Sequence, residues 1–292
     1  MCSCAGIALM MASAIGVRAE EPQARTALRA KYDQLRNGPK SSFGIPLYID
    51  SRQTDDALSG SVYSQVEQPF EAVKKDLREP RHWCEILILH PNVKGCSVSE
   101  GTAKPSLSVV LGSMEQTATF TFEVVAATAE FLDVRLNAAS GPMGTTDYRF
   151  TVQATPLDAR RTLLHLAYSH GYGARAKIAM QTYFGTLGRG KVGFTVVDTT
   201  TAGSPVHVDG LRGGLERNAM RYYLAIQAHL DQMAAPREER LEKCLRTWLV
   251  HIERYPLQLK EVDGYVERKR AEIRRFETQP GSLSQQAGKG RG

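Results

Sequence analysis

Long apolar runs are missing from most of this sequence. The most apolar segment, residues 5–17 (AGIALMMASAIGV), is shorter than the roughly 20 residues that a helix needs to cross a bilayer. No later segment approaches that length. We therefore expect the rest of the chain to contain no membrane-spanning helix.

The motifs of common catalytic and cofactor sites are missing as well. There is no GxxxxGK[ST] phosphate loop and no GxSxG nucleophile motif. Residues 188–193 spell GxGxxG, but they lead into an expected strand, so no helix N-terminus follows to hold a phosphate. No CxxC or His-x-x-x-His spacing indicates zinc. We expect no cofactor, no metal and no catalytic residue.

The charge is mildly basic and dispersed. The formal net charge is +6, with 37 Lys and Arg against 31 Asp and Glu. The densest basic stretch, residues 267–275, is interrupted by acidic residues, and no nucleic-acid-binding module accompanies it. We expect no nucleic-acid partner, while weak peripheral contact with an anionic membrane surface stays open. With 42% hydrophobic and 23% charged residues, the composition is that of an ordinary globular protein.

The N-terminus has the pattern of a secretory signal peptide. Residues 5–17 have the length of its apolar core, although no Lys or Arg precedes them. Val17 and Ala19 are short side chains at the two positions that a signal peptidase reads, which predicts cleavage near Ala19 and a periplasmic or secreted protein. Cys2 and Cys4 precede the apolar run, so no lipoprotein is expected. The alternative is a buried N-terminal helix.

Cleavage would leave Cys84, Cys96 and Cys244. In an oxidising compartment an odd number of cysteines predicts one disulfide and one free thiol. Cys84 and Cys96 enclose a loop of suitable length, so we expect these two to pair.

Alternation of apolar and polar residues predicts an antiparallel sheet with one buried and one wetted face. In Ala118–Val125, for example, Phe120, Phe122 and Val124 alternate with polar residues. The segments expected to form strands are Ile45–Ile49, Gly60–Glu67, Ser106–Leu111, Ala118–Val125, Phe131–Asn137, Asp147–Ala154, Thr162–His170 and Lys191–Val197.

Helical spacing of apolar residues predicts a long amphipathic helix at Gly214–Met233. Ala174–Leu187 fits an inserted helix, with a strand as the competing assignment. Further helices are expected at Gln23–Arg36, Pro69–Arg78, Trp83–Leu89, Arg237–Arg254 and Pro256–Glu277.

The opening of this series carries the clearest resemblance. A strand is followed by Gln68–Leu77 and then by Glu79–Trp83 (EPRHW), and about six antiparallel strands and a long helix come next. Over residues 58–233 this order resembles the START-like (SRPBCC, polyketide cyclase-like) superfamily. The resemblance implies an α+β helix-grip fold, in which a curved antiparallel sheet wraps a long C-terminal helix, here with a C-terminal helical extension. Members of that superfamily bind or carry apolar ligands, and some are cyclases or dehydratases.

The expected organisation follows from these patterns. Residues 1–19 form the signal peptide, 20–57 a lead-in segment, 58–233 the START-like domain and 236–278 the helical extension. Residues 279–292 are rich in Gly, Ser and Gln, a composition typical of a disordered tail.

A curved sheet and one helix leave a space between them, and apolar walls would make it a ligand site. The residues expected to face this space are Phe122, Tyr148, Phe150, Leu166, Tyr168, Phe194, Tyr223 and Ile226. Buried tyrosines need a partner for the hydroxyl, so Tyr148, Tyr168 and Tyr223 are expected to orient a polar ligand head.

Several charged and histidine side chains lie close to this set in the sequence. His165 and His170 are five residues apart in one strand, so they lie on opposite faces, with His170 on the cavity side. His90, before Pro91, is expected in a loop. On the long helix, Glu216, Arg217 and Arg221 are expected to form surface ion pairs, with an acidic ligand head as the alternative partner of the two arginines.

Three functions fit the sequence. The favoured one is a periplasmic binding or carrier protein for an apolar, lipid-like ligand. The first alternative is a cyclase or hydrolase-type enzyme that uses the same cavity. The second is an envelope interaction protein, in which the helices after Pro236 bind a partner.

Overall fold

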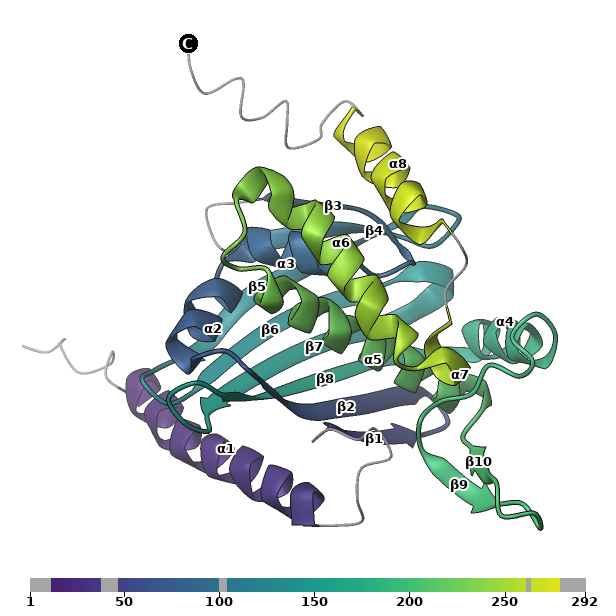
Figure 1. The fold of residues 1–292 in the computed structure, drawn as a ribbon, viewed down its shortest axis with the longest axis horizontal. Coiled ribbons are helices and arrows are strands. Elements are labelled where there is room, and N and C mark those ends of the chain that lie inside the picture. The colour runs from purple at the N-terminus through teal and green to yellow at the C-terminus, as the bar shows by residue number, and fades with distance from the viewer. Residues whose placement is uncertain (1–11, 38–46, 100–103, 261–263, 279–292) are drawn as a thin grey trace, which may run out of the picture.

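The computed structural model describes residues 12–37, 47–99, 104–260 and 264–278. They form an α+β protein built on one eight-stranded antiparallel sheet with the strand order β1-β2-β8-β7-β6-β5-β4-β3 (Figure 1). The strands are β1 Leu47–Gln53, β2 Ala57–Val66, β3 Val93–Ser99, β4 Ser106–Leu111, β5 Gln116–Ala127, β6 Leu132–Ser140, β7 Thr145–Pro156 and β8 Thr162–Tyr172.

Two short helices and one long helix cover the inner face of the sheet (Figure 1). Helices α2 (Phe70–Leu77) and α3 (Pro80–Leu87) follow β2, and Pro80 occupies the first turn of α3, where its missing N–H costs nothing. Helix α5 (Gly210–Asp231) packs on β1, β2, β8 and α3. This is the predicted helix-grip arrangement, and the expected positions of these helices are confirmed to within a few residues.

Two strand predictions differ from the structure. Val93–Ser99 was not predicted, yet it forms the edge strand β3 paired with β4. Lys191–Val197 was expected to complete the main sheet, and this prediction is wrong. Instead, β9 (Val196–Thr199) pairs with β10 (Pro205–His207) in a separate two-stranded sheet. The competing assignments for Ala174–Leu187 are resolved in favour of a helix, α4 (Ala174–Gly185).

The segment before the sheet covers its outer face. Helix α1 (Ala12–Asn37) runs beneath the sheet (Figure 1). Its Leu28 and Tyr32 pack with Phe131 and Leu163 on the side of the sheet away from α5. Alternation explains the two layers, because Leu163 faces α1 while the next residue, Leu164, belongs to the core under α5. The predicted domain boundaries stay predictions. Among the described residues, no helix is both long and apolar enough to cross a membrane.

The C-terminal helices bury the other side of α5. Helix α6 (Arg237–Glu253) packs along α5, α7 (Pro256–Leu259) follows it, and α8 (Tyr265–Glu277) packs on β3 (Figure 1). Apolar residues of all three belong to the same core as the sheet. Most apolar side chains of these helices are therefore buried within the chain.

The structure overturns the prediction of surface ion pairs on the long helix α5. Glu216 is only 1% exposed, and Arg217 and Arg221 are also buried. The Glu216 carboxylate accepts the backbone N–H groups of Phe194 and Thr195, at 2.6 and 2.9 Å. Periodicity identified the stripe that faces the sheet, but it could not show that the opposite stripe would also be covered.

The buried amine of Lys269, in the C-terminal extension, should make the free energy of unfolding depend on pH. Lys269 is fully buried, donates to the carbonyl of Val93 and lies 3.1 Å from Glu272. Burial lowers the pKa of Lys269 to about 8, against about 10.4 in an unfolded chain. Between these values the unfolded chain keeps a proton that the folded chain has lost, so the free energy of unfolding rises with pH.

Lys269→Met removes this titration. We expect the wild type to gain about 3 kcal/mol relative to the variant between pH 7 and pH 10.5, because each pKa unit corresponds to about 1.4 kcal/mol. Urea unfolding of both proteins at each pH measures this difference, in which the titration of groups far from Lys269 cancels. A difference that stays constant over this range would contradict it.

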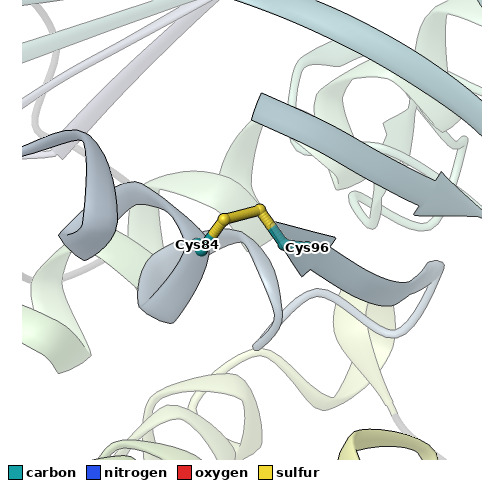
Figure 2. Close-up of a disulfide and its surroundings, with 2 residues drawn as sticks. All are labelled: Cys84 and Cys96. Carbon is teal, nitrogen blue, oxygen red and sulfur yellow. A yellow bond between two sulfur atoms is a disulfide. The ribbon is translucent and has the colours of Figure 1, made fainter. Parts of the chain in front are cut away.

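Cys84 on α3 and Cys96 on β3 form the expected disulfide, with their Cα atoms 5.3 Å apart (Figure 2). Cys244 is free and buried. The bond joins the helix that covers one end of the inner face to the edge strand of the sheet.

Replacing Cys84 and Cys96 together by Ser should lower the free energy of unfolding by about 2–3 kcal/mol, because the bond closes a short loop in the unfolded chain. Urea unfolding of the variant and of the oxidised wild type measures the change. Reduced wild type serves as the control and should match the variant.

Candidate functional site

A small cavity lies where the prediction places the ligand site, between the inner face of the sheet and helices α3 and α5. Its volume is about 20 Å³ for the centre of a water-sized sphere, which is room for about one water molecule. The walls are almost entirely apolar and come from α3, β4, β5, β6, β7 and α5: Leu87, Val109, Leu111, Phe120, Leu136, Tyr148, Phe150 and Tyr222.

Aromatic side chains form a continuous cluster around this cavity. The ring of Phe150 lies 4.6 Å from that of Tyr168 and 4.8 Å from that of Tyr222, measured between centroids. Tyr222 in turn stacks on His90 at 4.3 Å. Aromatic pairs at such distances stabilise the fold beyond the burial of their apolar surface. The cluster therefore forms a well-packed side of the cavity next to α5.

Tyr148 and His170 form the polar part of this cluster. Their rings stack at 5.2 Å, and the Tyr148 hydroxyl lies 2.8 Å from the hydroxyl of Thr145. Burial raises the pKa of Tyr148 and lowers the pKa of His170. Both shifts favour the uncharged forms, which suits a site for an uncharged ligand.

The structure brings only part of the predicted set to the cavity. Tyr148 and Phe150 line it, and Tyr168 contacts both of them from the next strand. Three of the predicted residues lie in the surrounding core without lining this cavity: Phe122, Leu166 and Ile226.

The other two predicted residues lie elsewhere. Tyr223 is fully buried, and its hydroxyl faces Ser64 on β2, while burial raises its pKa. Phe194 precedes β9, outside the main sheet, and its ring packs edge-on against Tyr255 at 5.6 Å. The prediction that Phe194 faces the cavity fails because the strand on which it was placed does not exist.

The histidine predictions are confirmed. His165 stacks on Tyr63 at 4.2 Å on the outer face of the sheet, whereas His170 contacts Tyr148 on the inner face. The Nδ1 atom of His90 accepts the backbone N–H of Asn92 at 3.1 Å, as suits a residue in a turn.

Sequence reasoning did not assign several lining residues to the site. Phe120 shares the alternation of Phe122, and Tyr222 lies on the same helix as Tyr223. The pattern marks all of these as buried, but only the position of α5 along the strands decides which side chains border the space.

A second group of polar side chains lies apart from these cavity-lining residues. Asp76 on α2, His82 on α3 and His229 on α5 bring three potential metal-ligand atoms within 4.8 Å of one another. None of them was singled out from the sequence, because two of the residues lie on separate short helices and the third is more than a hundred residues further along the chain.

The eight-stranded antiparallel sheet and the long helix α5 packed on its inner face define the fold as START-like, of the helix-grip class. The chain is similar in structure to human StAR-related lipid transfer protein 5, with 13% identity over 74% of this chain and 99% of that one, at a TM-score of 0.37. It is also similar to norcoclaurine synthase from Thalictrum flavum, with 12% identity over 47% of this chain and 91% of that one, at a TM-score of 0.35.

A third similar structure is a conserved protein from Geobacillus kaustophilus, with 15% identity over 59% of this chain and 95% of that one, at a TM-score of 0.36. No protein-family model and no curated protein matches the chain. Because these likenesses are distant, the role of the site rests on its own geometry.

Proposed function

We propose that this chain is a binding or carrier protein for an apolar, lipid-like ligand held between the sheet and α5. The observation that supports this most is the apolar cavity enclosed by aromatic residues of β5, β7 and α5. Such walls favour apolar ligands, and the Tyr148 hydroxyl offers one polar contact for a ligand head.

The cavity must widen to take such a ligand, since about 20 Å³ accommodates only a water molecule. Two lining residues, Leu111 and Tyr148, are half-buried and lie beside the β4–β5 and β6–β7 turns. Met114 and Met143, both exposed, lie on these turns. The backbone N–H of Met143 donates to the side chain of Gln116 at 3.0 Å, and this hydrogen bond joins the two turns. We place ligand entry at this end, where movement of the two turns would widen the cavity.

Gentle purification followed by organic extraction and mass spectrometry tests the proposal. We expect a stoichiometric apolar molecule, or uptake of one equivalent of added fatty acid in native mass spectra. A protein that carries nothing and takes up neither fatty acids nor phospholipids would overturn it.

We further propose that the chain is exported and processed near Ala19. The apolar N-terminal segment and the Cys84–Cys96 disulfide both support this. The α1 side chains buried against the sheet, Leu28 and Tyr32, follow Ala19, so cleavage would leave this contact intact. In a bacterial host we expect an intact mass that starts at Glu20 in the periplasm, and a full-length mass in the cytoplasm would contradict export. Weak membrane contact stays a prediction.

One observation favours the enzymatic alternative. His170 is buried beside Tyr148, and its lowered pKa leaves an uncharged imidazole able to accept a proton. Should extracts reveal a compound that the protein converts, His170→Gln should abolish turnover while ligand uptake persists. Unchanged turnover would remove this residue from the mechanism.

A further inference from the structure

The polar group at Asp76 is more closely connected than a set of surface charges. His229 Nε2 lies 2.7 Å from one oxygen of the Asp76 carboxylate, and His82 Nδ1 lies 3.0 Å from the other. The His229 side chain is 0% exposed, Asp76 is buried, and His82 is 25% exposed. The group therefore has a buried side formed by α5 and a side that solvent reaches at His82.

Two buried atoms behind this group lack hydrogen-bond partners among the described residues. They are His229 Nδ1 and Glu85 Oε2, which lie 3.7 Å apart. A neutral His229 carries a single proton. If this proton sits on Nε2 and is donated to Asp76, the lone pair of Nδ1 faces a lone pair of Glu85 Oε2. Leaving buried polar atoms unpaired in this way costs free energy.

A metal ion on Nε2 removes this conflict. The proton of His229 then sits on Nδ1 and points at Glu85, which is the usual arrangement of a carboxylate behind a metal-bound histidine. A divalent cation also balances the two carboxylates, Asp76 and Glu85, when both imidazoles are neutral.

We propose that Asp76, His82 and His229 bind a divalent transition metal of the zinc type, and that Glu85 orients His229. Two imidazole nitrogens and one carboxylate oxygen are a ligand set that zinc accepts, and three protein ligands leave a fourth position for water. The ligand atoms already lie within 4.8 Å of one another, so small side-chain shifts bring all three to a common ion. The site ties α2 and α3 to α5, and it stands whether or not the cavity binds a ligand.

Metal titration of the full-length chain tests this site. All proteins carry Cys2→Ser and Cys4→Ser, so that these thiols cannot bind the metal, and the disulfide is kept oxidised. After removal of metals with a chelator, Zn²⁺ is titrated by calorimetry, and bound zinc is counted by elemental analysis. Co²⁺ replaces it for absorption spectra. We expect one equivalent, with a cobalt spectrum of nitrogen and oxygen ligation.

Single substitutions distinguish a metal site from a hydrogen-bond network that only joins the helices. Asp76→Asn and His82→Gln should each lower zinc affinity at least about 100-fold, whereas His207→Gln, outside the group, should leave it unchanged. Glu85→Gln should keep the stoichiometry and lower affinity about 10–100-fold, as the loss of an orienting carboxylate does. His82 is partly exposed, so its variant is expected to fold, and circular dichroism checks this. The proposal would be overturned if the protein with intact Asp76, His82 and His229 bound no stoichiometric zinc. It would also be overturned if the Asp76 and His82 variants bound zinc as tightly as that protein does.

Discussion

Replacement of Trp248 by Ala should lower the free energy of unfolding by about 3–5 kcal/mol, the usual cost of removing a fully buried large aromatic residue. Trp248 on α6 is 0% exposed, and its ring stacks on Tyr265 at 4.6 Å. Its indole N–H donates to the backbone carbonyl of Arg221 on α5 at 3.2 Å. The substitution therefore leaves a cavity between α5, α6 and α8 and removes the hydrogen bond that joins α6 to α5.

Urea unfolding followed by circular dichroism measures this effect. Val250→Ala is the matched control, because Val250 lies on the same helix, is 54% exposed, and should change stability by less than about 0.5 kcal/mol. If both variants had the stability of the wild type, the C-terminal helices would not belong to the cooperative core.

Val109→Phe should strongly weaken the ligand uptake that we propose. Val109 is buried on β4 and lines the cavity. The added ring atoms exceed the space of about 20 Å³, so they fill the cavity and press against α3 and α5. We expect at least a tenfold loss of affinity for an apolar fluorescent probe displaceable by fatty acid, together with an overpacking cost of about 1–3 kcal/mol.

The control places the same ring on the other face of the sheet. Thr119 on β5 is exposed and pairs with Ser108, the residue that precedes Val109. Thr119→Phe should therefore bind the probe as the wild type does. A folded Val109→Phe protein with unchanged uptake would show that the ligand binds outside this cavity, and thermal unfolding establishes that the variant is folded.

Local patterns in the sequence were sufficient for most of the secondary structure. Alternation is clear in β6 and in most of β5 and β7, because each strand has one face against the core and one against solvent or α1. It breaks at Val124, which is exposed and lies at an irregular register between β5 and β6. Pro69 and Pro80 mark the starts of two short helices, since proline is best tolerated just before or within the first turn of a helix. The disulfide was also predictable, because the loop length and the predicted export indicated the pair.

Edge strand β3 is an element that local sequence patterns did not predict. Val93–Ser99 contains Gly95, and its composition does not favour a strand by itself. It is extended because β4 offers a hydrogen-bonding edge and α8 packs on it. A Cβ at position 95 would overlap the ring of Phe276, so Gly95 permits the close approach of a helix from the far end of the chain.

The sequence by itself determined that a two-faced sheet and a long amphipathic helix form, and which of their side chains are apolar. Only the tertiary structure decided that α6 buries the second side of α5, that Phe194 leaves the sheet, and that His229 meets Asp76 and His82. The physical reason is the distance along the chain over which each signal acts. Alternation and helical periodicity act over a few residues, whereas these contacts join residues up to 153 positions apart, and their positions depend on how whole elements pack.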